Sequence, residues 1–290
     1  MHATRLHASD PEAIATSIDA LTHCPVCASA VAPTGQAARC HCAGCGTIWM
    51  PRRRCYSYDD AYPDSQGHFH PAIGRCKQVT LRYWLNRTIG PVAGKRVLEV
   101  GFGGGATLDW LRQQDALVWG QEPIAANRHA AVAGGIEADR IKTNLAEFAG
   151  LQFDLALYLD SFEHILDPIA HLRTLNTITA PGSRALLVLP VADCLPRRLM
   201  GRAWPHDSAD HWVFYSTSGL TRMWQQAGWR LADSFYPWKL VSLQALARHA
   251  QVKTGLRLPL DILPSFGVWL NFGERGLIFE KQTDGASAPS

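Results

Sequence analysis

The sequence predicts an α/β protein whose mostly parallel sheet of seven strands carries helices on both faces, with a small metal-binding module ahead of it. Three observations predict this class. From Lys95 onward, apolar strand-like segments alternate with amphipathic helical ones, the pattern of a parallel sheet covered on both sides. A glycine-rich turn follows the first strand-like segment. Five of the eight cysteines fall between positions 24 and 45.

The strand-like segments are short and apolar, and the helical ones are periodic. The predicted strands are 95–100, 116–122, 140–144, 153–159, 183–190, 229–237 and 276–282. The predicted helices are 72–89, 106–115, 124–134, 169–179, 216–228 and 240–252. Ser216 and Thr217 suit the start of one helix and Gly228 its end, while Pro181-Gly182 ends another.

Composition excludes several classes of protein. An apolar content of 47% with 18% charged residues indicates a globular chain, and a net charge of +3 does not announce a polyanionic partner. No stretch approaches the roughly 20 apolar residues that cross a bilayer, and the first 20 residues lack the apolar core of a signal peptide. We therefore expect a cytoplasmic protein without a transmembrane segment.

The turn "GFGGGA", residues 101–106, leads from the first strand into the first helix of the sheet. Glycines let backbone pass close to a ligand, and a helix start directs N–H groups at it. Gly101, Gly103 and Ala106 fit the dinucleotide pattern G-x-G-x-x-A, which alone is a weak signal. Glu99 followed by Gly101, Gly103 and Gly105 fits a second pattern, an acidic residue before three alternating glycines.

Two later segments favour the second pattern. "FDLALYLDSFEHILDP" and "HWVFYSTSGLTRMWQQAGW" follow the turn in order, so that residues 95–235 resemble class I S-adenosylmethionine (SAM)-dependent methyltransferases of the small-molecule and ubiquinone-methyltransferase type. The resemblance implies a Rossmann-like methyltransferase sheet with SAM as cofactor. It places cofactor contacts at Glu99, Gly101, Phe102, Gly103, Gly105, Glu122, Asn144, Leu145, Asp160 and Ser161.

Several of these positions have a second interpretation. A carboxylate at Glu122, which ends the second strand, binds ribose hydroxyls in dinucleotide-binding proteins as well. The residue types of Asn144 and Ser161 also suit helix caps, and capping and ligand contact can coexist.

Histidines are the candidates for removing a proton from an acceptor hydroxyl. Methyl transfer requires alignment of nucleophile, methyl and sulfur, and a hydroxyl nucleophile must also lose its proton. His211 lies in the loop after the fifth strand, and His164 follows the end of the fourth. Glu163 and His206 are weaker candidates. The alternative is that each histidine only stabilises a turn through a hydrogen bond.

The clustered cysteines predict a structural zinc site. Cys24 and Cys27 form one C-x-x-C knuckle and Cys42 and Cys45 a second, and four thiolates close a tetrahedral site that leaves no position for substrate. Cys40 and His41 are alternative ligands at the second knuckle, although the paired spacing favours Cys42 and Cys45.

These patterns give a domain plan. We expect a flexible lead-in at 1–20, a zinc ribbon at 21–55, a connector with a cofactor-covering helix at 56–94, the methyltransferase domain at 95–282 and a tail at 283–290. An insertion at 239–272 is expected to be extra core, a dimer face or a wall for an apolar acceptor.

The acceptor is the least determined part of the prediction. We expect a hydroxyl of a sugar, glycan precursor or secondary metabolite, in a monomer or homodimer that can touch a membrane surface. The alternatives are an RNA-modifying enzyme that uses the ribbon and "PRRR" to hold phosphates, and a non-catalytic scaffold. "LDSF" lacks the Asn/Asp-Pro-Pro-aromatic motif of base-nitrogen methyltransferases, so nucleic acid is the less favoured substrate.

Overall fold

A computed structural model describes residues 23–30, 39–49, 71–207, 211, 213–244, 246–247, 251 and 267–283. The predicted lead-in, residues 50–70 of the ribbon and connector, residues 252–266 of the insertion and the tail beyond 283 lie outside the described residues.

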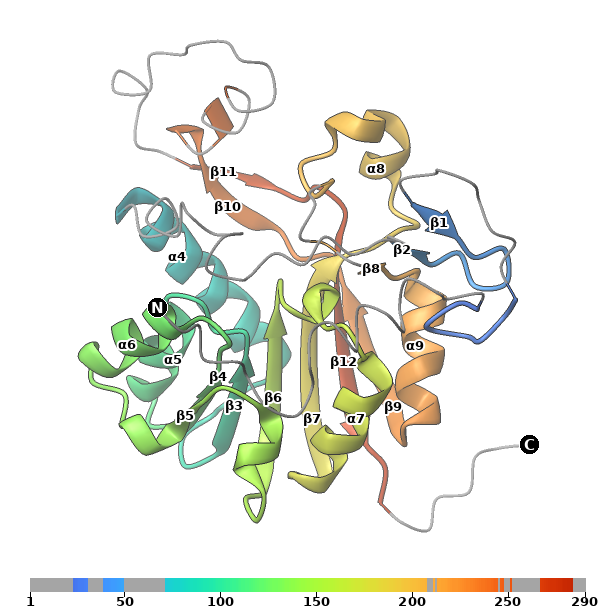
Figure 1. Cartoon of the computed structure of the whole chain (residues 1–290). Helices are drawn as coiled ribbons and strands as arrows, with labels where there is room; N and C mark the ends of the chain where they lie inside the picture. Colours follow the sequence, from blue (N-terminus) through green and yellow to red (C-terminus); the bar gives the residue numbers. More distant parts are fainter. Residues whose placement is uncertain are drawn as a thin grey trace, which may run out of the picture.

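A seven-stranded sheet forms the centre of the molecule (Figure 1), which confirms the predicted fold class. Its strands stand in the order β5-β4-β3-β6-β7-β12-β9. Their bounds are β3 Arg96–Val100, β4 Leu117–Gln121, β5 Ile141–Lys142, β6 Phe153–Leu159, β7 Thr179–Pro190, β9 Trp229–Phe235 and β12 Glu274–Lys281. The first five are parallel, and β12 runs antiparallel to both of its neighbours.

Helices cover both faces because successive strand residues point to opposite sides. Leu155 and Leu157 of β6 share a buried cluster with α4 (Pro71–Thr88), α5 (Ala106–Arg112) and α6 (Ala125–Ala133). Ala156 and Tyr158 of the same strand share the opposite cluster with α7 (Pro168–Thr177) and α9 (Thr217–Gln226). Shorter helical segments are α8 (Leu195–Met200), η1 (Ala138–Arg140), η2 (Leu145–Phe148), η3 (Phe162–His164) and η4 (Gly201–Ala203).

Side-chain caps fix where the helices of the second face begin. The Asp167 side chain accepts the N–H of Ala170 at 2.9 Å, and Pro168 occupies the first turn of α7, where its missing N–H is not needed. The Ser216 hydroxyl accepts the N–H of Gly219 at 3.0 Å and starts α9. The sequence "LDP" therefore fixes Asp167 as the residue at which the segment after β6 ends and α7 begins.

The insertion differs from the prediction. Residues 239–242 form a strand, β10 (Lys239–Ser242), which pairs antiparallel with β11 (Gly267–Leu270) and lies beside α4. The predicted helix at 240–252 is therefore wrong over its first three residues, and helical backbone begins at 243. The partner strand satisfies the backbone groups of β10, and the Leu240 N–H of its outer edge donates to the Thr80 hydroxyl at 2.9 Å.

The cysteine-bearing segments form a second, smaller sheet with part of the main domain. We call residues 23–30 and 39–49 the cysteine module. Its strands β1 (Cys40–His41) and β2 (Ile48–Trp49) are joined by β8 (Val213–Phe214), which follows the main domain's fifth strand. The module lies at the side of the molecule beside α9 (Figure 1). Over the residues described, no helix is both long and apolar enough to span a membrane.

Candidate functional site

The glycine turn connects β3 to α5 through three left-handed glycines. Gly101, Gly103 and Gly105 have φ values of 70°, 55° and 75°, which L-residues with a side chain rarely adopt. Gly101 also faces Ser161 at the end of β6, where an added Cβ would lie 2.7 Å from the Ser161 Cβ. Glycine is thus required at 101 both by the backbone and by the close approach of β6.

Glu122 is tied to the turn by its carboxylate. The Gly103 N–H donates to Oε2 at 2.8 Å, and the Ile124 N–H donates to Oε1 at 3.0 Å. Each oxygen has a second lone pair for another donor. The carboxylate is therefore held beside the turn in a position from which it can also accept hydroxyl groups.

Glu99 and Phe102, two predicted cofactor contacts at the start of the turn, are both buried. Glu99 lies within β3 directly before the turn. The Phe102 ring belongs to the core cluster under α5, and Gly120 makes room for it, because a Cβ there would lie 2.5 Å from the ring. Residue 102 can therefore contact a cofactor through its backbone but not through its ring.

The two predicted caps behave differently. Asn144 caps η2 in a reciprocal capping box with Glu147, whose Oε1 accepts the Asn144 N–H at 2.8 Å, and the adjoining Leu145 is buried. Ser161 holds the N-cap position of η3, but its side chain makes no capping bond there. Its buried hydroxyl has no hydrogen-bond partner among the described residues. Capping explains Asn144, and it does not explain Ser161.

Asp160 is the first residue after β6 and has a left-handed backbone, with φ of 54°. Such a conformation costs a non-glycine residue about 1–2 kcal/mol and persists where the surroundings determine it. The Lys239 ammonium donates to both carboxylate oxygens, at 2.8 and 2.7 Å. Lys239 thus joins the insertion to the end of β6.

Lys239 continues into a buried charge network. Its Nζ lies 3.0 Å from Glu274 Oε1, and His206 Nε2 lies 3.0 Å from the same oxygen. Burial opposes the charge of Lys239, but Asp160 and Glu274 outweigh it and raise the pKa of Lys239. Burial likewise opposes the charge of Glu274, and Lys239 and His206 outweigh it and lower the pKa of Glu274. The Lys239 ammonium and the Glu274 carboxylate therefore both stay charged near neutral pH.

Glu163, His164 and His211 meet beside this network. The imidazole rings of His164 and His211 are 4.8 Å apart between centroids, and His211 Nε2 lies 4.0 Å from Glu163 Oε1. The Glu163 side chain is 0% exposed and that of His211 12%. Potential ligand atoms of the three residues lie within 4.8 Å of one another. Two imidazoles and a carboxylate suit proton transfer, and the same donor set suits a divalent cation.

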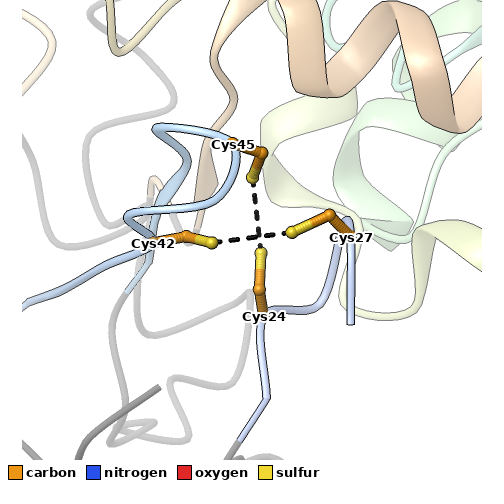
Figure 2. A group of neighbouring side chains, drawn as sticks. All are labelled: Cys24, Cys27, Cys42 and Cys45. Carbon is orange, nitrogen blue, oxygen red and sulfur yellow. Dashed lines mark hydrogen bonds between the residues drawn. The ribbon is translucent and has the colours of Figure 1, made fainter. Parts of the chain in front are cut away.

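The four predicted zinc ligands converge in the cysteine module. Figure 2 shows the sulfurs of Cys24, Cys27, Cys42 and Cys45 pointing toward a common centre. Cys24 Sγ is 3.6 Å from Cys45 Sγ, and Cys27 Sγ is 3.5 Å from Cys42 Sγ. Four thiolates about 2.3 Å from a tetrahedral zinc ion are spaced roughly 3.8 Å apart, so the residues fit the ion. Burial opposes ionisation of Cys27, but hydrogen bonds with Ser29 outweigh it and lower the pKa of that thiol to about 6.

The structure therefore brings the predicted site residues together in two places. The turn, Glu122 and the end of β6 form one group, and the two candidate histidines form another with Glu163. Lys239 and Glu274 were missed by sequence reasoning. Lys239 directly precedes the segment predicted as helical, and no local pattern indicates that it pairs with Asp160, 79 positions away in the chain.

Comparisons with known proteins agree with this architecture. A family model described as a methyltransferase domain matches residues 70–234. The ubiquinone biosynthesis O-methyltransferase of Aeromonas salmonicida is 28% identical over 189 residues, which cover 59% of this chain and 76% of that protein. The enzyme of the same name from Klebsiella pneumoniae is 30% identical over 128 residues, covering 42% of this chain and 52% of that protein. This chain thus spans only about half the length of the second relative.

Two solved structures share the fold. One is a complex of the Haloferax volcanii Trm112 methyltransferase activator with a putative methyltransferase, with a TM-score of 0.53 at 16% identity over 79% of this chain and 98% of the matched one. The other is a SAM-dependent methyltransferase from Thermotoga maritima, described as a possible histamine N-methyltransferase, with a TM-score of 0.51 at 14% identity over 78% and 98%. At these identities the likeness concerns the fold alone.

Proposed function

This chain belongs to the methyltransferase-domain family and is a SAM-dependent methyltransferase, and from that premise we propose that it methylates a hydroxyl group of a small molecule. The observation that carries the proposal is the meeting of Glu163, His164 and His211 next to the carboxyl end of β6. In parallel α/β sheets, ligands bind at the carboxyl ends of the strands. A proton-accepting group is therefore placed where an acceptor would reach the methyl donor.

The cofactor half of the site lies at the glycine turn. SAM, when bound, supplies an electrophilic methyl group. The turn glycines leave room for backbone contact, and the Glu122 carboxylate accepts the ribose hydroxyls. Glu99, Asn144, Leu145, Asp160 and the backbone of Phe102 complete the proposed cofactor contacts. The Ser161 hydroxyl, buried without a partner among the described residues, is a further candidate contact to the cofactor.

The proposed base is His211, with His164 as the second candidate. An imidazole nitrogen of His211 takes the proton of the acceptor hydroxyl. Glu163 beside Nε2 stabilises the imidazolium that forms, as a buried carboxylate does for a catalytic histidine. A separation of 4.0 Å is long for a direct hydrogen bond, and such contacts tighten when substrate binds.

The nature of the acceptor rests on chemistry and on the relatives. A hydroxyl nucleophile needs a base, and the two curated relatives described above are named ubiquinone biosynthesis O-methyltransferases. Precursors of that pathway are the first compounds to assay, followed by sugars, glycan precursors and secondary metabolites. The cysteine module is proposed to hold a structural zinc ion through Cys24, Cys27, Cys42 and Cys45. Four clustered cysteines that bind zinc are typical of a reducing compartment, which supports the cytoplasm as the proposed location.

The test is transfer of a labelled methyl group from SAM to these compounds, followed by localisation of the label by mass spectrometry. The variants His211→Ala and His164→Ala are compared with the parent for SAM binding by calorimetry and for turnover. A general base contributes typically 10²–10⁴-fold, so the base variant loses at least about a hundredfold in turnover while its SAM affinity stays. Full turnover in both variants would remove the histidines from the mechanism.

A further inference from the structure

We propose that the metal-loaded cysteine module positions His211 by holding the segment 211–216, so that the zinc site orders the acceptor half of the active site but not the cofactor half. The proposal rests on the role of His211 given above. It assigns the cysteine module a function in the reaction although no cysteine touches the reacting groups.

The first connection is a strand pairing. β2 of the module pairs with β8, with Ile48 opposite Phe214 and Trp49 opposite Val213. β8 begins two residues after His211, so the backbone of the histidine-bearing segment is part of the module's sheet. The three strands of this sheet are each two residues long. Strands this short do not form a stable sheet by themselves.

The second connection joins the second cysteine knuckle to the end of the same segment. The Ser216 hydroxyl donates to the backbone carbonyl of Cys45 and accepts the N–H of Gly219 at 3.0 Å. The Thr47 hydroxyl, two residues after Cys45, lies 3.2 Å from Cys45 Sγ. One hydroxyl therefore fixes both the knuckle and the start of α9. Residues 213–216, which follow His211 closely in the chain, are held between a strand of the module and a turn whose shape the metal ligands determine.

The third connection is apolar packing. Cys24, Cys42 and Val26 belong to the same buried cluster as Tyr215 and Leu220 of the main domain. On the other side of β8, the Arg39 guanidinium lies 4.6 Å from the centre of the Phe214 ring and pairs with Asp207. The module thus encloses the segment from both sides of β8.

Metal binding is what makes the module rigid. Structural zinc sites contribute folding free energy directly, because the ligands hold no fixed arrangement without the ion. The glycine turn and Glu122 are instead held by β3, β4 and the end of β6, through the contacts described above. Loss of the ion is therefore expected to loosen residues 211–216 and to leave the SAM site intact.

The experiment compares the full-length parent with the double variant Cys42→Ser, Cys45→Ser, and uses Cys76→Ser, in α4, as a cysteine control outside the module. Bound zinc is measured by elemental analysis, SAM affinity by calorimetry, and backbone protection by hydrogen exchange. We expect loss of zinc, exchange at Val213 and Phe214 at least about tenfold faster, and a SAM dissociation constant within about twofold of the parent. The control retains zinc and protection.

A second variant covers the case in which the double variant does not fold. Ser216→Gly removes the hydroxyl that contacts Cys45, while glycine at an N-cap costs only a few tenths of a kcal/mol. It should retain zinc and SAM affinity and lose protection at Val213 and Phe214. Unchanged protection in Ser216→Gly, or in a zinc-free double variant, would overturn the proposal. An equal loss of SAM binding would also overturn it, because the module would then support the whole domain. Failure of His211 as the base would instead appear as full turnover of His211→Ala, with zinc and protection unchanged.

Discussion

Replacing Lys239 with Met should destabilise the fold more than the loss of a surface ion pair does. The change removes the cation that lies 2.7 Å from Asp160 and 3.0 Å from Glu274, while a side chain of similar length still fills the space. Glu274 is 2% exposed and is left with the His206 Nε2 contact at 3.0 Å. Its negative charge is then buried without the ammonium that compensates it.

The size of the effect follows from burial. Breaking a buried ion pair by removing one partner costs about 3–5 kcal/mol. Lys239 is 20% exposed and Asp160 44%, so water replaces part of the lost interaction and we expect the lower end, about 3 kcal/mol. For a chain of this size each kcal/mol lowers the melting temperature by roughly 2 °C, which predicts a drop of about 6 °C.

Calorimetric and denaturant unfolding of four proteins isolates the pair: the parent, Lys239→Met, Glu274→Gln and the double variant. Because Lys239 and Glu274 touch, the double variant should lose less unfolding free energy than the two single variants lose together. The difference should be at least about 1 kcal/mol. Arg230→Met is the matched control, because Arg230 and Glu280 pair at 2.8 Å with side chains 58% and 41% exposed. That exposed pair should contribute about 0–1 kcal/mol. A loss in Lys239→Met no larger than the control's, or additive single effects, would refute the reasoning.

Four further predictions address pH, the cofactor turn and the histidine cluster. Lys239 and His206 lower the pKa of Glu274, so the ionised carboxylate stabilises the fold fully above the unfolded pKa of about 4.3. This stabilisation is lost as the pH falls below that value. The unfolding free energy of Glu274→Gln should therefore decrease less steeply with falling pH than that of the parent. Gly101→Ala, with φ of 70° and Ser161 2.7 Å away, should cost more than the 1–2 kcal/mol of a left-handed residue and abolish SAM binding in calorimetry. Glu122→Gln should weaken SAM binding at least about tenfold, because charged hydrogen bonds contribute about 1.5–3 kcal/mol, and should also lower the melting temperature, because the amide nitrogen cannot accept the second backbone N–H. Turnover should be unaffected by brief treatment with a chelator; a loss that Mg²⁺ restores would make Glu163 and its neighbouring histidines metal ligands rather than a base.

The fold was predictable from sequence because its signals are local. The central strands β3 and β6 are short, mostly apolar runs, and the positive φ values of Gly101, Gly103 and Gly105 belong to a turn that the sequence marks by its glycines. β10 was not predictable, because residues 239–242 become a strand only by pairing with β11, which begins 25 residues after β10 ends. β8 was missed for the same reason, since its two residues have a partner about 165 positions away.

The same contrast separates the two halves of the site. Motifs identify the cofactor half because one turn and the ends of two strands supply it. On the proposed acceptor side, the strand that begins two residues after His211 pairs with residues 48–49, and Asp160 is held by Lys239. Each of these contacts joins segments that are far apart in the sequence, so no local pattern predicts it. An acceptor site assembled in this way can change its substrate through the module or the insertion while the turn stays fixed. Changes of specificity within this architecture should therefore concentrate in residues that touch β8 and β10, and SAM affinity should be indifferent to them.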